Sequence, residues 1–182
     1  VIIVNWNSGD FLSECLDSLI EFGGDDINRI IIVDNDSSDN SLKKLDTIDN
    51  IIVIKNDKNL GFGKSCNIGA SHSQSTNILF LNPDARIFKD TLVNCLRYMN
   101  LPKNNNVGIL GVKLYNQKNE VGRSCARFPN VKRLFFKSTG LEKFLPKYGL
   151  FMTDFDHLSV REVDQVIGAF FLVKCHVFNE LN

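Results

Sequence analysis

The sequence predicts an α/β protein with a mainly parallel sheet flanked by helices. Three observations predict it. Short apolar runs rich in β-branched residues recur through the first half of the chain, amphipathic segments of helical period separate them, and polar clusters follow them. Helices of this length between strands indicate right-handed β-α-β crossovers and therefore a parallel sheet. The 182 residues suit one domain with a substantial core.

The apolar runs define the expected strands, which lie at 1–4, 30–33, 51–54, 78–81 and 107–112. Apolar residues at helical spacing predict helices at 10–22, 63–71 and 91–99, and a short one through Leu42 and Leu45. Ser8 or Asp10 is a plausible N-cap of the first helix, and Gly23-Gly24 ends it.

The second part of the chain is less regular. Residues 114–160 mix Gly, Pro, Lys and aromatics without a sustained period, which predicts a long loop with short helices. Strand character returns at 163–173, interrupted by Gly168, and a helix starts near 174–178. Both ends of the chain look cut, so we expect a fragment.

Composition excludes several classes of protein. The 21 basic and 21 acidic residues balance, which removes the positive charge expected of a nucleic-acid binder. A local basic patch at Lys132, Arg133 and Lys137 reads as a solvated loop. No apolar run is long enough to span a membrane, and no signal peptide is present. Five widely spaced cysteines without a Cys-x-x-Cys pair predict a reduced, cytoplasmic protein, with a catalytic Cys66 as a weak alternative.

Polar clusters follow the predicted strands at 5–7, 34–39, 56–59 and 82–84. In open parallel sheets, ligands bind beyond the carboxyl ends of the strands. We therefore expect these clusters to form one rim that holds a ligand.

The sharpest cluster is Asn82-Pro83-Asp84, which comes directly after a buried strand. The proline fixes the local backbone and presents Asp84 in a defined direction. Such a carboxylate can hold Mg²⁺ or Mn²⁺ together with diphosphate oxygens. The alternative is a turn in which Asp84 caps residues 85–88.

Asp34 closes the second predicted strand. Its carboxylate can accept the imide N3–H of uracil or thymine, a proton that cytosine lacks. The alternative is that Asp34 caps the following turn. We assign Ser38 and Asp39 to capping.

The segment 59–69 follows a strand and opens a helix, so its backbone N–H groups and Lys64 can face an anion. Its glycine spacing matches neither a P-loop nor a dinucleotide-binding loop. The alternative is a glycine-permitted turn with a solvated lysine.

Together, Val-Asn-Trp-Asn (4–7), Val-Asp-Asn-Asp-Ser-Ser-Asp (33–39), the segment 59–69 and Leu-Asn-Pro-Asp-Ala (81–85) resemble family 2 glycosyltransferases of the GT-A (Rossmann-like) fold. The nearest subgroup is the rhamnosyltransferase-like one. Residues 163–173 resemble the family's later acceptor-side segment. The resemblance therefore implies a nucleotide-sugar-binding half at 1–113 and the start of an acceptor-side half at 114–182. The motifs follow the family's order across nearly the whole chain.

This resemblance implies an inverting transferase that uses a nucleotide-diphosphate sugar, a dTDP- or UDP-sugar and possibly rhamnose, with Mg²⁺ or Mn²⁺ as cofactor. It implies a saccharide or lipid-linked acceptor, no nucleic acid, and a cytoplasmic location that can include the inner face of the membrane. Asp84 is the implied metal ligand. The family's metal motif has two aspartates, so a single one implies weaker metal dependence. The donor-binding residues are expected to be Asn5, Asn7, Asp34, Asn59, Gly61, Lys64, Asn67, Asn82 and Asp84.

The family's catalytic base follows the Gly-Ala strand, and we expect it to lie beyond Asn182. Asp164 is a weak candidate for contact with the acceptor, and pairing with Arg161 is the alternative. A nucleotide-sugar-binding module without turnover is a second hypothesis. A dinucleotide-binding oxidoreductase is excluded, because residues 5–10 offer only Gly9 where Gly-x-Gly-x-x-Gly is needed.

Overall fold

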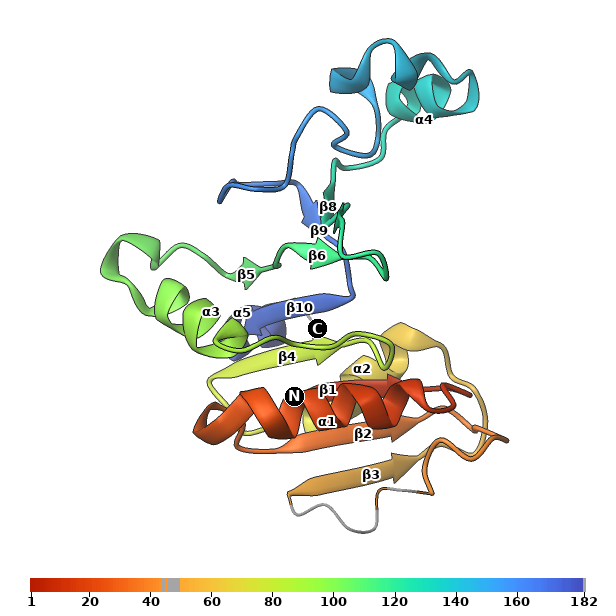
Figure 1. The fold of residues 1–182 in the computed structure, drawn as a ribbon, viewed down its shortest axis with the longest axis vertical. Helices are drawn as coiled ribbons and strands as arrows, with labels where there is room; N and C mark the ends of the chain where they lie inside the picture. Colours follow the sequence, from red (N-terminus) through yellow and green to blue (C-terminus); the bar gives the residue numbers. More distant parts are fainter. Residues whose placement is uncertain (44, 46–49, 182) are drawn as a thin grey trace. The chain divides into compact units, whose positions relative to one another are not determined.

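The computed structural model describes residues 1–43, 45 and 50–181. The chain divides into two compact units (Figure 1). The first comprises Val1–Leu110 and Gly168–Asn182, and the second comprises Gly111–Ile167. Each unit is described by itself below.

A six-stranded sheet forms the centre of the first unit, in the order β3-β2-β1-β4-β10-β5. The strands β3, β2, β1 and β4 are parallel, and β10 is antiparallel to both of its neighbours. Their bounds are β1 Ile2–Asn5, β2 Ile30–Asp34, β3 Ile51–Lys55, β4 Asn77–Leu81, β5 Ile109–Leu110 and β10 Phe170–Lys174. The predicted class, a mainly parallel sheet flanked by helices, is confirmed.

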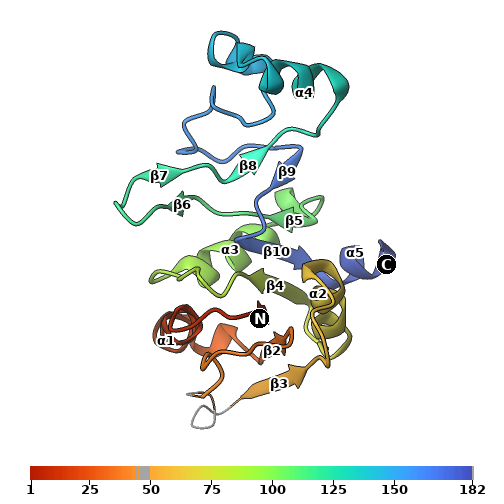
Figure 2. The same ribbon diagram turned by 90° about the vertical axis from the view of Figure 1, so that its right-hand side faces the viewer.

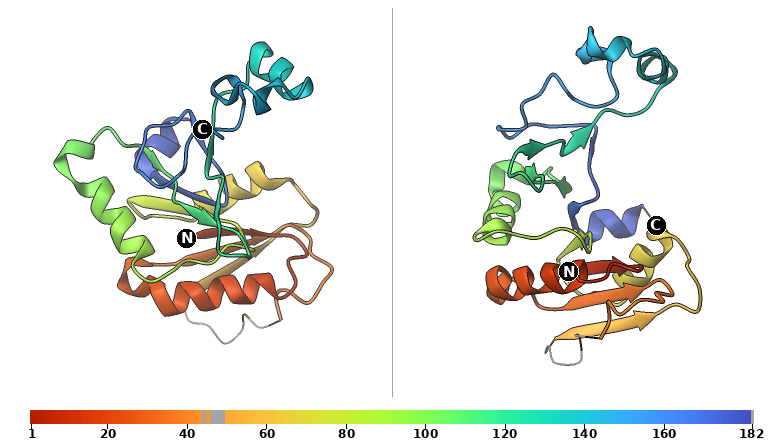
Figure 3. Two further views of the ribbon diagram at one scale, coloured as in Figure 1. Left: turned by 45° about the horizontal axis from the view of Figure 1, so that its top comes forward. Right: turned by 45° about the vertical axis from the view of Figure 1, so that its right-hand side comes forward.

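Helices cover both faces of this sheet, with α1 and α3 on one face and α2 and α5 on the other (Figures 2 and 3). The helices are α1 Phe11–Gly23, α2 Phe62–Ser71, α3 Thr91–Asn100 and α5 Cys175–Glu180, with short 3-10 turns η1 Gly24–Asp26 and η3 Pro102–Asn104. Two helical layers explain the continuous apolar runs of β1 and β2, because each residue of those strands is buried whichever face it points to.

The core beneath α2 and α5 is built from alternate strand residues. Its buried members are Ile2, Val4, Ile31, Val33, Cys66, Ile78, Phe80 and Val173. Phe178 of α5 completes it, with its ring centroid 5.3 Å from that of Phe80.

Gly69 sets the distance between α2 and the sheet. A Cβ atom at this position would lie 2.5 Å from Cγ2 of Ile2 and 3.2 Å from Cγ2 of Val33. Both neighbours are buried β-branched residues with little freedom to move. The glycine therefore lets the helix approach β1 and β2, which brings the first turn of α2 to the carboxyl edge of the sheet.

The second unit has little regular structure. It contains a pair of two-residue strands, β6 Leu114–Tyr115 with β7 Val121–Gly122, and a second pair, β8 Cys125–Ala126 with β9 Gln165–Val166. One helix, α4 Val131–Ser138, packs against two 3-10 turns, η4 Leu141–Lys143 and η5 Pro146–Tyr148.

Most expected elements of the first unit are confirmed within a residue or so. The strand expected at 107–112 is wrong in extent, because only Ile109 and Leu110 pair with β10. The residues expected to form a short helix through Leu42 and Leu45 lie partly outside the described residues. The expected functional halves stay a prediction; structurally, β10 and α5 belong to the first unit.

The basic patch around Lys132 is a helix, so the expectation of a solvated loop is wrong. The Lys132 ammonium lies 4.1 Å from the centroid of the Tyr148 ring, and Arg133 donates to the carbonyl of Phe128 at 2.7 Å.

We predict that Gly69→Ala lowers the free energy of unfolding by about 1–3 kcal/mol, because the added methyl group overpacks the contact with Ile2. The control is Gly63→Ala in the same helix, where a Cβ meets no atom within 4 Å. That change should be neutral or stabilising by up to about 1 kcal/mol. Urea unfolding measures both, and equal effects would contradict the close approach.

Candidate functional site

The carboxyl ends of the parallel strands lie at one edge of the sheet, and the predicted polar clusters follow them. Asn5 and Asp34 are register partners at the ends of β1 and β2. Lys55 pairs with Asp34 at the end of β3. Asn82 directly follows β4, the other neighbour of β1. The topology therefore places these clusters along one rim, as the sequence predicts.

Asn5 is a fully buried polar residue at this edge, with 0% exposure. Its amide nitrogen Nδ2 lies 2.8 Å from Oδ1 of Asp34, 2.9 Å from Oγ of Ser41 and 3.1 Å from Oγ of Ser37. The side chain therefore fixes the carboxylate and the loop after β2. These contacts are all within the protein, and contact of Asn5 with a nucleotide-sugar donor stays a prediction.

Asp34 is 3% exposed and both carboxylate oxygens have partners. Oδ1 accepts from Asn5, and Oδ2 accepts from the backbone N–H of Ser37 at 3.2 Å. The second bond is the turn-capping contact weighed above as the alternative. Each carboxylate oxygen has a further lone pair, so the cap leaves capacity to accept one more donor. Contact with a base stays a prediction.

Asn7 ties the loop after β1 to the loop after β2. Its Oδ1 accepts from the backbone N–H of Ser38 at 2.8 Å and of Asp39 at 3.2 Å. The left-handed backbone of Asn7, with φ 52°, brings the side chain into this position. Ser38 thus donates to Asn7, and its expected capping role is wrong.

Asp39 does cap, as expected. Its Oδ1 accepts from the hydroxyl and the N–H of Ser41, and its Oδ2 accepts from the N–H of Gly9 at 2.7 Å. The Ser41 hydroxyl bond is the largest cause of the lowered pKa of the Asp39 carboxyl; burial opposes it, and the backbone N–H groups of Gly9 and Ser41 lower the pKa further. The carboxylate therefore fastens the two loops in its charged form.

Asn35 is the residue that the sequence analysis missed. It is buried, and its Oδ1 accepts from Ser65 Oγ at 2.9 Å, Asn56 Nδ2 at 3.0 Å and Leu60 N at 3.1 Å. One oxygen atom therefore holds together the end of β2, the loop after β3 and the first turn of α2. A polar residue directly after five buried strand positions was the signal for it.

The loop that opens α2 is shaped by Asn59 and Gly61. Asn59 Oδ1 accepts from the Gly61 N–H at 2.9 Å, and Gly61 has φ 83°, a region that favours glycine. Lys64 and Asn67 are exposed on α2. Burial raises the pKa of the Cys66 thiol to about 11, which argues against a catalytic thiolate.

The segment after β4 presents Asp84 to solvent. Asn82 donates its N–H to the carbonyl of Ala169 at 3.1 Å, and its carbonyl accepts from Ala85 N, which closes the turn. Asp84 itself is exposed. Burial and then the Asp84 charge raise the pKa of the nearby Cys15 thiol to about 12. The Cys15 thiol also donates to the carbonyl of Asn82 at 3.7 Å, so this segment lies against the N-terminal part of α1.

Asp84 is an exposed carboxylate that this edge offers to a divalent cation. Within residues 1–43, 45 and 50–181, no group of three or more His, Cys, Asp or Glu side chains is arranged to hold a metal ion. Mg²⁺ is commonly bound by one or two carboxylates plus substrate phosphates and waters. An exposed Asp84 fits that mode of binding and does not fit a cage made by the protein alone.

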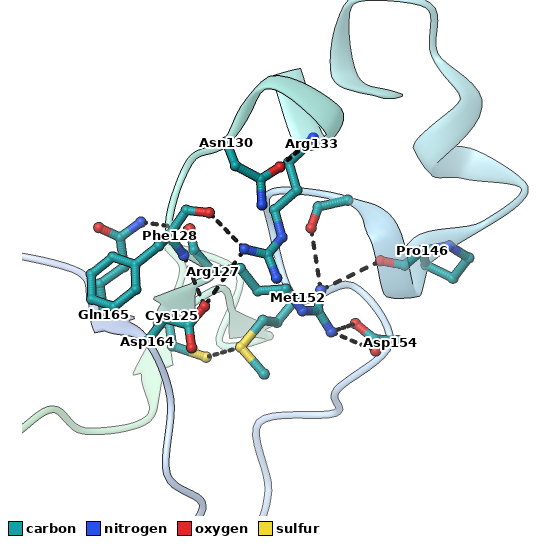
Figure 4. A network of polar contacts seen from close by, with 11 residues as sticks. Cys125, Arg127, Phe128, Asn130, Arg133, Pro146, Met152, Asp154, Asp164 and Gln165 are labelled. Atoms are coloured by element: carbon teal, nitrogen blue, oxygen red, sulfur yellow. Dashed lines mark hydrogen bonds and ion pairs between the residues drawn. The ribbon is translucent and has the colours of Figure 1, made fainter. Parts of the chain in front are cut away.

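Asp164 lies in the second unit and has structural partners (Figure 4). Its Oδ2 accepts from the Phe128 N–H at 2.9 Å and lies 3.8 Å from Nη1 of Arg133. The expected pairing with Arg161 is wrong, because Arg161 lies over the ring of Phe155. Contact of Asp164 with an acceptor stays a prediction.

Comparison with known proteins gives a family match. The family model described as glycosyl transferase family 2 matches residues 1–170. No curated protein sequence matches the chain.

Two solved structures share the fold. The first is a mannosyltransferase from Pyrobaculum calidifontis, solved in complex with GDP-Man and Mn²⁺, at 19% identity and a TM-score of 0.54, covering 65% of this chain. The second is S. aureus TarS 1-349, at 23% identity and a TM-score of 0.56, covering 72% of this chain. The matches span only 35% and 38% of those two chains, and at these identities they show the fold alone.

We predict that Asn35→Ala lowers the free energy of unfolding by about 1–3 kcal/mol, because Leu60 N and Ser65 Oγ lose their acceptor. Hydrogen exchange at the Leu60 amide should accelerate. The control is Asn59→Ala, which removes one exposed bond to Gly61 and should cost less than about 1 kcal/mol. Unchanged exchange at Leu60 in Asn35→Ala would contradict the role of this oxygen.

Proposed function

Because the chain belongs to glycosyl transferase family 2, we propose that the carboxyl edge of β1, β2 and β4 binds the nucleoside diphosphate of a nucleotide-sugar donor. The observation that carries the proposal is the set of buried side-chain bonds that fixes the loops of this edge. A site whose loops are already ordered loses less entropy on binding a ligand.

We propose that the Asp34 carboxylate contacts the base of the nucleotide. Asn5 and Ser37 hold its carboxylate in one orientation, and a spare lone pair can accept the N3–H of uracil or thymine. Cytosine offers an acceptor at N3, so a fixed carboxylate would reject it. We therefore propose a uridine or thymidine diphosphate sugar as donor, with rhamnose as one candidate sugar.

Asp84 and the first turn of α2 are the proposed holders of the diphosphate. The unpaired N–H groups at a helix N-terminus favour an anion, and Lys64 on that turn is exposed. Asp84 would share Mg²⁺ or Mn²⁺ with the diphosphate oxygens, as the single carboxylate permits. When bound, the cation would neutralise charge on the departing nucleoside diphosphate. The remaining proposed donor contacts are Asn5, Asn7, Asn59, Gly61, Asn67 and Asn82.

Inverting transfer of the sugar to a saccharide or lipid-linked acceptor is the reaction that we propose for the whole protein. It needs a general base to take the proton of the acceptor hydroxyl. We assign that role to no residue of the described chain, since Asp164 is engaged by Phe128 and Arg133. Donor binding without turnover is the second candidate function. A turnover assay with radiolabelled UDP- and dTDP-sugars distinguishes the two.

The donor site is tested by calorimetry with uridine and thymidine diphosphates, with and without Mg²⁺. We expect binding that Mg²⁺ strengthens. Asp84→Ala should weaken binding in Mg²⁺ by about tenfold or more and remove the effect of the cation. Asp25→Ala, an exposed carboxylate of η1, is the matched control and should change neither.

Two results would contradict this assignment. If neither diphosphate binds to the folded protein, the proposed donor site is ruled out. An Asp84→Ala variant that keeps a full response to Mg²⁺ shows that Asp84 holds no metal.

The base contact has a separate test. Asp34→Asn replaces one acceptor oxygen by a donor group, so the preference for uridine over cytidine diphosphate should fall by about tenfold or more. The control is Ser37→Ala, which removes a hydroxyl that bonds Asn5 and keeps the carboxylate. The ratio of the two affinities is measured on variants that remain folded. An unchanged ratio in Asp34→Asn limits Asp34 to capping the turn.

A further inference from the structure

Most apolar side chains of helix α4, in the second unit, are exposed to solvent. Only Arg133 and Phe136 are partly buried, so they mark the inward face. At 100° per residue, Val131, Leu134 and Phe135 lie on the opposite, outward face. Val131 is 85% exposed and Phe135 is 56% exposed. A surface helix of a globular protein has the reverse arrangement.

The turn η4 extends this apolar surface. It packs against α4, and Leu141, Phe144 and Leu145 in and beside it are exposed, with Phe144 at 82%. We call the six residues Val131, Leu134, Phe135, Leu141, Phe144 and Leu145 the α4–η4 surface. Large exposed apolar side chains gathered on two elements that pack together are typical of an interaction site.

Lysines border the α4–η4 surface. Lys132 and Lys137 lie on opposite flanks of the outward face of α4 by helical geometry, and Lys143 and Lys147 are in η4 and η5. Three of their ammonium groups lie over aromatic rings: those of Lys132 and Lys147 over Tyr148, and that of Lys137 over Phe151.

Charge is unevenly distributed along the chain. Residues 130–148 contain five basic and one acidic side chain, although the whole chain carries 21 of each sign. The α4–η4 surface is therefore the apolar centre of a positive patch.

Polar contacts hold the segment that carries this surface. Arg127, 12% exposed, donates from Nη2 to both carboxylate oxygens of Asp154, at 2.8 and 2.7 Å (Figure 4). This ion pair joins the chain before α4 to the chain after η5. Asn130 caps α4 by accepting from the Arg133 N–H at 2.9 Å. The helix is thus formed with its apolar face outward, and no rearrangement is needed to expose it.

We propose that the α4–η4 surface docks on the headgroup region of a membrane that contains anionic phospholipids. Exposed aromatic and aliphatic side chains bordered by lysines are the pattern of an interfacial amphipathic helix. Lysine is depleted in the centres of protein–protein interfaces, and two copies of this patch would bring like charges together. None of the helices among the described residues has the length and apolarity needed to span a bilayer.

Docking on a membrane would bring the protein to a lipid-linked acceptor, which is one of the acceptors proposed above. The inference rests on the proposed function only in this respect. Vesicle binding is measured without a sugar donor, so either proposal can fail while the other holds.

The test is co-sedimentation of the protein with vesicles of phosphatidylcholine mixed with phosphatidylglycerol, with pure phosphatidylcholine vesicles as reference. We expect binding to the mixed vesicles that weakens as salt rises from about 0.1 M to about 1 M, since the Debye length shrinks from about 10 Å to about 3 Å. Phe135→Ser with Phe144→Ser should reduce the partition coefficient by about tenfold or more.

Matched control variants distinguish binding by this surface from non-specific binding of the protein to vesicles. Ile20→Ser removes an exposed apolar side chain of α1 and should leave vesicle binding unchanged. Lys143→Glu should weaken binding about fivefold or more, and Lys103→Glu in η3 should weaken it much less.

Three results would overturn the proposal. They are equal binding to neutral and anionic vesicles, equal losses in the surface and control variants, or no binding by the folded protein. Light scattering is run in parallel, and a dimer that the Phe135→Ser and Phe144→Ser changes dissociate would assign the surface to a second copy instead.

Discussion

The side-chain oxygen of Asn35 and the amide of Asn5 are the interactions on which the carboxyl edge of the sheet depends. Parallel strands end there together, and their loops leave polar groups that must find partners inside the protein. Asn35 accepts from three donors of the β3–α2 region, and Asn5 reaches the loop after β2. Without them, the loop after β3 would lose its bonds to Asn35, and the loops after β1 and β2 would be held together by the exposed contacts of Asn7 and Asp39.

This arrangement couples stability and the proposed binding of a donor. Asp34 caps its own turn and carries the proposed base contact, so its orientation is determined before any ligand arrives. Asp84 differs, since it is exposed and contributes nothing to the core. In the proposed site, the burial of Asp34 would fix the acceptor for the base, and the exposure of Asp84 would give a hydrated cation and diphosphate access.

The two units follow different physical rules. Every residue of β1 and β2 is buried between helical layers, and the order of the first unit follows from that. The second unit has two-residue strand pairs and one helix whose apolar side chains face outward. Ion pairs such as Arg127 with Asp154 replace a large core there. An exposed apolar surface is tolerated in such a unit when a partner surface covers it in the working state.

The sequence by itself determined the fold class, the strands β1 to β4, the helices α1 to α3 and the edge where the polar clusters gather. These follow from local periodicity and from the rule that parallel strands end at one edge. Tertiary structure alone decided the antiparallel place of β10, the short β5, the hydrogen-bonding role of Asn35 and the partner of Asp164. Those features depend on contacts between residues far apart in the chain. Neither propensity nor spacing encodes which distant donor meets a given acceptor.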